Sequence, residues 1–134
     1  MSDILNRGTY VASRVRHASM WRAVRADGYR ITSTWIDEAG PGETHDMAEL
    51  WERIAREVAT SARLVLYIEP DDFPLKGALV EAGMALAHLI PVMVVAPAVV
   101  LDDGCRPIGG WIRHPLVRRR DSIEAALLGA DLCL

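Results

Sequence analysis

Residues 64–95 read LVLYIEPDDFPLKGALVEAGMALAHLIPVMVV, and this stretch decides the fold of the chain. It opens with an apolar run, Leu64 to Ile68, and closes with another, Val92 to Val95. Continuous apolar runs of this length are typical of strands that are buried on both faces of a parallel sheet. The segment between them, Gly77 to Leu89, is predicted to be a helix. A strand, a helix and a strand in this order predict a parallel pair joined by a right-handed crossover.

The rest of the chain repeats this alternation of strands and helices. Further strands are predicted at three places, in addition to those near 64–68 and 92–96, namely near residues 9–12, 29–35 and 116–118. Helices are predicted up to about Asp27, after Asp46 and from about Ser122. We therefore expect one α/β domain over residues 1–134, with a flavodoxin-like or Rossmann-like sheet of five parallel strands and helices on both faces.

The composition excludes several classes of protein. Hydrophobic residues make up 51% of the chain and charged residues 25%, which is typical of a globular protein and not of a disordered one. The net charge of -3 argues against a nucleic-acid partner, so Arg113 and the run from Arg118 to Arg120 are interpreted as a solvated patch. His88, Pro91 and Pro97 interrupt the longest nearly apolar stretch, so we expect no membrane span and no membrane partner.

The chain also lacks the sequence signals of a metal site, a cofactor or export. Its two cysteines, Cys105 and Cys133, are far apart, and its histidines do not have metal-ligand spacing. It contains neither a glycine-rich dinucleotide motif nor a phosphate loop. The first residues lack the basic and apolar regions of a signal peptide. We therefore expect a cytoplasmic protein without a metal or a cofactor.

One residue of the predicted helix over 77–89 stands out chemically. Glu81 is the only carboxylate in a helix that is apolar on nearly all sides, which predicts that the helix is buried. A carboxylate in such surroundings is costly unless it is paired or put to use. Its place in the first turns of the helix favours the ionised form. Glu81 is therefore either a nucleophile that faces a ligand crevice, or a residue that reaches solvent or pairs with Lys76.

Other candidate residues follow the ends of the predicted strands. Ligands of parallel α/β sheets bind beyond the carboxyl ends of the strands, and the segments expected at that edge are 12–17, 35–37 and 69–81. Arg14 and Arg16 follow the first strand, where they suit an anionic group, although ordinary surface arginines are the alternative. Trp35 ends the second strand, where it can stack on a nucleobase or pack in the core.

Three segments carry a resemblance to a known family. They are Tyr10-Val11-Ala12-Ser13-Arg14, the stretch from Gly28 to Trp35, and Gly77-Ala78-Leu79-Val80-Glu81-Ala82-Gly83-Met84-Ala85. They resemble the nucleoside 2-deoxyribosyltransferase family, including its relatives that hydrolyse the N-glycosidic bonds of nucleotides. The resemblance runs from about Thr9 to Leu128, and its most specific part is the Gly-x-x-x-Glu-x-Gly-x-Ala motif. It implies a flavodoxin-like fold without a redox cofactor and assembly as a homodimer or a larger homo-oligomer.

The resemblance also assigns chemistry to particular residues. It implies that Glu81 attacks the anomeric carbon of a nucleoside and forms a glycosyl-enzyme intermediate. Tyr10 matches an aromatic position close to that nucleophile and is expected to be a second catalytic residue, with a tyrosine that packs in the core as the alternative. Ser13 and Gly77 lie in the matching segments, and we expect them to contact the substrate. The nucleotide-cleaving relatives recognise monophosphates through the loop after the first strand, where Arg14 lies.

The chain departs from the family pattern at two positions. The family often has an aspartate two positions before the motif glycine, where this chain has Leu75, and another in the region that corresponds to residues 55–59. Asp72 is expected to replace the first as a catalytic carboxylate, with Asp71 in contact with the substrate. Glu57 is the candidate to replace the second. These departures favour hydrolysis over transfer between bases.

The sequence therefore predicts a protein that cleaves the N-glycosidic bond of a nucleoside or a nucleoside 5′-monophosphate. The phosphate is expected to bind Arg14 and Arg16. Two alternatives stay open: a nucleotide-sensing module without catalytic activity on the same scaffold, and a glycohydrolase of NAD-type dinucleotides. The Trp111-Ile112 segment and the helix that carries Trp51 are candidate contact surfaces for a homo-oligomer.

Overall fold

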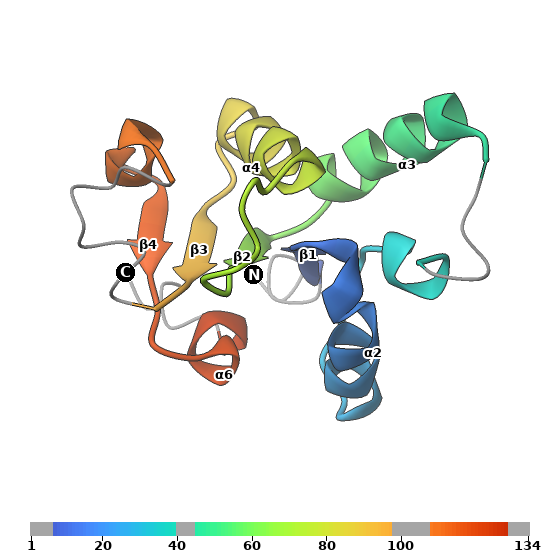
Figure 1. The fold of residues 1–134 in the computed structure, drawn as a ribbon, viewed down its shortest axis with the longest axis horizontal. Helices are drawn as coiled ribbons and strands as arrows, with labels where there is room; N and C mark the ends of the chain where they lie inside the picture. Colours follow the sequence, from blue (N-terminus) through green and yellow to red (C-terminus); the bar gives the residue numbers. More distant parts are fainter. Residues whose placement is uncertain (1–6, 40–44, 98–107, 129–134) are drawn as a thin grey trace.

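The computed structural model describes residues 7–39, 45–97 and 108–128. Within these ranges, four parallel strands form one sheet in the order β1-β2-β3-β4 (Figure 1). The strands are β1 (Thr9–Ala12), β2 (Arg63–Tyr67), β3 (Val92–Val95) and β4 (Val117–Arg119). In the middle of the sheet, Val11 pairs with Val65 and Val65 with Met93. The predicted parallel α/β architecture is confirmed, but the predicted number of five strands is wrong.

Residues 29–35 do not form the fifth strand. Ile31 makes an isolated parallel bridge to Thr9, on the edge of β1 opposite β2. Two residues further on, the hydroxyl of Ser33 accepts the Val11 N–H at 2.8 Å, in the place where a strand would offer a backbone carbonyl. The chain then turns into the 3-10 helix η2 (Trp35–Asp37). A serine side chain that competes with the backbone therefore ends the pairing after one bridge.

Helices cover both faces of the sheet (Figure 1). They are α2 (Ala18–Ala26), α3 (Met47–Ala59), α4 (Gly77–Ala87) and α6 (Ile123–Leu127), with short 3-10 turns η1 (Val15–His17) and η3 (Gly110–Arg113). Figure 1 shows α3 and α4 on one face, and α2 and α6 on the other. The predicted cap of α3 is present, because the side chain of Asp46 accepts the Glu49 N–H at 3.0 Å.

The core lies between the sheet and these helices. Every residue of β1 and β3 is buried, and β2 is buried except at its last residue. Helix α4 packs on the sheet through small side chains, Ala78, Ala82 and Ala85, which allow a close approach. Glu81 lies on the same side of α4 as these alanines and is buried with them. The predicted burial of the helix is confirmed for this face only, because Leu79 and Val80 on the other side of α4 are exposed.

Other sequence predictions concern membranes, partners and cysteines. No helix in the described part of the chain is long and apolar enough to cross a bilayer. Of the proposed oligomer contacts, Ile112 is buried, and Trp111 is partly buried and donates to the backbone oxygen of Ile108 at 2.6 Å. Cys105 and Cys133 lie outside the described residues.

Candidate functional site

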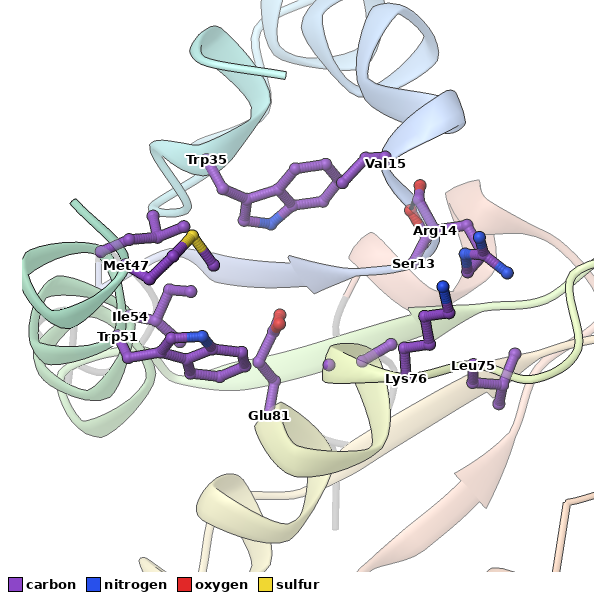
Figure 2. Close-up of a pocket in the computed structure, with 13 residues that line it drawn as sticks. Ser13, Arg14, Val15, Trp35, Met47, Trp51, Ile54, Leu75, Lys76 and Glu81 are labelled. Atoms are coloured by element: carbon purple, nitrogen blue, oxygen red, sulfur yellow. Dashed lines mark hydrogen bonds between the residues drawn. The ribbon is translucent and has the colours of Figure 1, made fainter. Parts of the chain in front are cut away.

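A pocket opens beside the carboxyl end of β1 and the first turns of α4 (Figure 2). Its volume is about 250 Å³, somewhat below the roughly 300–1,000 Å³ usual for pockets that enclose a drug-sized ligand. The lining residues come from four segments of the chain: Ser13, Arg14, Val15, Trp35, Met47, Leu50, Trp51, Ile54, Leu75, Lys76, Gly77, Ala78 and Glu81.

Glu81 supplies the carboxyl group of the pocket. Its side chain points into the pocket between Trp35 and Trp51 (Figure 2), although the residue is only 8% exposed. Burial raises the pKa of Glu81 to about 8; the Tyr10 hydroxyl opposes this rise, and the charge of Glu57 adds to it. Burial is the largest of these effects, and the carboxyl group is mostly protonated at neutral pH. The expected preference for the ionised form is not found.

Tyr10 lies behind Glu81 and does not line the pocket. Its side chain is fully buried in β1, and its hydroxyl makes no hydrogen bond of ordinary geometry. Burial, and then the neighbouring carboxyl group of Glu81, raises the pKa of Tyr10 well above its usual value. Tyr10 therefore lies close to Glu81, as predicted, but behind it and not in the pocket wall.

Two tryptophans form the apolar part of the pocket. Trp35 is buried and donates from its indole nitrogen to the backbone oxygen of Val11 at 2.8 Å, which fixes the ring. Trp51 comes from α3, and its ring covers Gly77 so closely that a Cβ at that position would lie 3.1 Å from it. Figure 2 shows Glu81 between the two rings and Met47 at the same end of the pocket.

The sequence reasoning missed Trp51 and Met47 as site residues. Both belong to the apolar stripe of α3, whose helical spacing is visible in the sequence. That spacing predicts an apolar face but does not distinguish a face that packs in the core from one that borders a pocket.

The opposite end of the pocket is cationic. Arg14 donates from Nη1 to the backbone oxygens of Asp72 and Pro74, at 2.9 Å each, so its guanidinium is held in place. Lys76, which the sequence reasoning did not assign to the substrate, lies on the same side of the pocket (Figure 2) and has a left-handed backbone with φ of 55°. Within the described residues, neither cation makes an ion pair with a carboxylate.

The remaining predicted site residues lie outside the pocket. Arg16 binds the carboxylates of Glu69, Asp71 and Asp72, at 3.1, 2.7 and 2.7 Å. Asp71, Asp72 and Arg16, which were expected to contact the substrate, therefore do not line the pocket, because these charges pair with one another. Glu57 also lies outside the pocket.

Of the predicted site residues, five line the pocket together, and they are Ser13, Arg14, Trp35, Gly77 and Glu81. Among the described residues, no group of three side chains is placed to hold a metal ion. No family model, curated protein or solved structure matches the chain. The fold and the pocket define an α/β protein with a buried carboxyl group between an aromatic and a cationic end of a pocket.

The two glycines of α4 allow a matched test of the pocket wall. Gly77→Ala places a methyl group against Trp51, so we expect a several-fold weaker affinity for a nucleoside or nucleotide. Gly83→Ala is the control, because nothing lies within 4 Å of the added Cβ. Alanine favours a helix interior by about 1 kcal/mol, so Gly83→Ala should raise the melting temperature and leave affinity unchanged. Thermal denaturation and titration by tryptophan fluorescence measure both effects, and equal affinities for the two variants would contradict this description of the wall.

Proposed function

We propose that the protein binds a nucleoside or a nucleoside 5′-monophosphate and cleaves its N-glycosidic bond, with Glu81 as the nucleophile. The observation that carries this proposal is the buried carboxyl group of Glu81, which opens into a pocket between two tryptophans and two cations. A nucleotide has a matching order of groups: an aromatic base, an electrophilic sugar carbon and an anionic phosphate.

The proposed reaction has two steps. The ionised Glu81 attacks the anomeric carbon, and the base leaves with the electron pair of the C–N bond and takes a proton from water. Water then attacks the same carbon, gives up a proton and releases Glu81 as a carboxylate. Two displacements at one carbon retain its configuration and divide a difficult step into two easier ones. Glu81 must first lose its proton, so the reaction depends on the ionised fraction of this group.

The sheet also supports the finer fold assignment that we propose, the flavodoxin-like one. If the segment around Ile31 is counted beside β1, the parallel elements follow the spatial order 2-1-3-4-5. Ligands of such sheets bind at the point where the strand order reverses, at the carboxyl ends of the strands. The pocket lies next to the carboxyl end of β1, which borders that point.

The cationic end of the pocket predicts a preference for phosphorylated substrates. Arg14→Ala removes a fixed guanidinium, so we expect the KM for a nucleoside 5′-monophosphate to rise about tenfold or more, with a smaller change in kcat. The KM for the corresponding nucleoside should change little. Arg30→Ala, which removes an exposed arginine outside the pocket, is the control. If the nucleoside and its monophosphate lose the same affinity, Arg14 does not bind the phosphate.

One observation favours a second candidate, a nucleotide-sensing module without catalytic activity. With a pKa of about 8, Glu81 is mostly protonated at neutral pH, and the protonated carboxyl group is not a nucleophile. A chromatographic screen for free base, with nucleosides, nucleotides and NAD as substrates, separates the candidates. Base release from nucleosides or monophosphates supports the proposed reaction, and nicotinamide release supports an NAD-type glycohydrolase. Binding without any release supports the sensing module.

We also propose that the protein acts in the cytoplasm as a homodimer or a larger homo-oligomer. The proposal rests on the family resemblance and on the small pocket, which a neighbouring subunit can extend at its mouth. The exposed apolar side chains Val15 and Met47 line that pocket and are available for such a contact.

A further inference from the structure

We propose that Asp72 is a positioning residue that fixes the mouth of the pocket by clamping two loops together. The first loop, residues 13–17, follows β1, and the second loop, residues 68–76, joins β2 to α4. The inference deepens the proposed function and rests on it only for the identity of the ligand. It replaces the catalytic role that the sequence predicted for Asp72.

Three donors converge on the carboxylate of Asp72, and we call these contacts the Asp72 clamp. Arg16 donates from Nε at 2.8 Å and His17 from Nε2 at 2.9 Å, both from the first loop. The backbone N–H of Glu69 donates at 2.8 Å from the second loop itself. Burial alone would raise the pKa of Asp72, but the Glu69 amide, His17 and Arg16 lower it below its usual value. The clamp is therefore held by an ionised carboxylate.

The same contacts leave Asp72 unsuited to chemistry on a ligand. One carboxylate oxygen is engaged by Arg16, and the other by His17 and the Glu69 amide. The side chain is buried and is absent from the pocket lining. A carboxylate with a lowered pKa and occupied oxygens is a poor base, so its role is to hold the two loops.

The clamp is coupled directly to the pocket walls. Arg14, from the first loop, donates to the backbone oxygens of Asp72 and Pro74 in the second loop. Residues 13–15 form one side of the mouth, and residues 75–78 form the other. The hydroxyl of Tyr67 donates to the Glu69 carboxylate at 2.6 Å. The rings of Tyr67 and His17 pack in a T-shaped arrangement. The spacing of the mouth and the place of the Arg14 guanidinium therefore depend on Asp72.

The test compares Asp72→Asn with Asp71→Asn. Asparagine keeps the size of the side chain but places an N–H donor against His17 or Arg16, so one side of the clamp opens. Asp71 is the matched control, because it also binds Arg16 but its side chain is 76% exposed, and exposed ion pairs contribute little. We expect amide hydrogen exchange of residues 13–18 to become at least about tenfold faster in Asp72→Asn, and to stay unchanged in Asp71→Asn.

A second readout is the affinity for a nucleoside 5′-monophosphate, measured by tryptophan fluorescence and as KM. We expect Asp72→Asn to raise Kd and KM about tenfold or more with little change in kcat, because a displaced guanidinium weakens binding and leaves Glu81 in place. A fall in kcat with unchanged KM and unchanged exchange would overturn the proposal and assign Asp72 to the chemistry.

The exchange experiment needs no ligand, so its outcome does not depend on the proposed function. Unchanged exchange in Asp72→Asn overturns the clamp even if the protein cleaves nucleotides. Faster local exchange supports the clamp even if no nucleotide is cleaved. If Asp72→Asn exchanges rapidly over the whole chain, Arg16→Gln is the variant to use, because it removes one donor from a half-exposed side chain. Its exchange should rise locally in residues 13–18, and no rise there would also overturn the clamp.

Discussion

Glu81→Gln is expected to abolish turnover, to preserve ligand binding and to make the protein more stable. Glutamine keeps the shape of the side chain but cannot form a glycosyl ester, so we expect kcat to fall by about a thousandfold or more. The pocket walls, including both tryptophans, are unchanged by the substitution, so affinity should stay within a few-fold of the wild type. The hydroxyl of Tyr10, which lacks a partner of ordinary geometry, is available to the new amide.

The gain in stability follows from the pKa of Glu81. The native protein keeps this proton up to about pH 8, whereas the unfolded chain releases it near 4.5. Unfolding between these pH values therefore releases a proton, and the free energy of unfolding falls as the pH rises. The stability that is fully present below pH 4.5 is lost progressively from pH 4.5 up to the folded-state pKa of about 8. The loss is roughly 3 kcal/mol at pH 7, and the uncharged Glu81→Gln should recover about 1–3 kcal/mol of it.

Chemical denaturation and base-release kinetics of the same preparations measure both effects. Glu52→Gln, an exposed substitution on α3, is the control and should change neither quantity. Wild-type activity in Glu81→Gln would rule out the proposed nucleophile. A loss of activity together with a loss of stability would instead assign Glu81 a structural role.

The second large effect is on the pH dependence of the reaction. If the ionised Glu81 is the nucleophile, kcat/KM should rise about tenfold per pH unit below pH 8 and reach a plateau above it. Between pH 6 and pH 8 the increase should therefore be on the order of fiftyfold.

This profile is best measured with a nucleoside, because a phosphate group itself titrates near pH 6. Asp71→Asn, which changes an exposed carboxylate outside the pocket, should leave the profile unchanged. A profile that is flat from pH 6 to 9, or that falls as the pH rises, would contradict a nucleophile with a raised pKa. A falling profile would favour a role for the protonated form of Glu81 as an acid.

The sequence predicts most of the sheet because continuous apolar runs have few alternatives. Such runs are found as β2 and β3, where nearly every residue is buried. Residues 29–35 show the limit of this reasoning. Their alternation in polarity is real, but Ser33 uses its hydroxyl where a strand would use its backbone, and periodicity cannot reveal that substitution.

The same contrast holds for the site. Glu81 could be found from sequence because a lone carboxylate in an apolar helix is costly without a purpose. Arg16 and Asp72 were predicted to act on the substrate but do not line the pocket, because charges on neighbouring loops can bind a ligand or bind each other. Here the guanidinium of Arg16 binds the carboxylate of Asp72, with 2.7 Å between nitrogen and oxygen. Which pairing occurs depends on how two loops meet, and sequence spacing does not encode that.

The most direct test of the proposed reaction is the stereochemistry of its product. The wild-type protein is incubated with a nucleoside or its 5′-monophosphate in water that contains methanol, and the methyl glycoside is analysed by proton NMR. Methanol then replaces water in the second step, and the methyl glycoside does not change configuration afterwards. Attack by Glu81 followed by attack of methanol predicts a product with the configuration of the substrate, and none from Glu81→Gln. A product of inverted configuration, or no release of base from any nucleoside or monophosphate, would contradict a glycosyl-enzyme intermediate on Glu81.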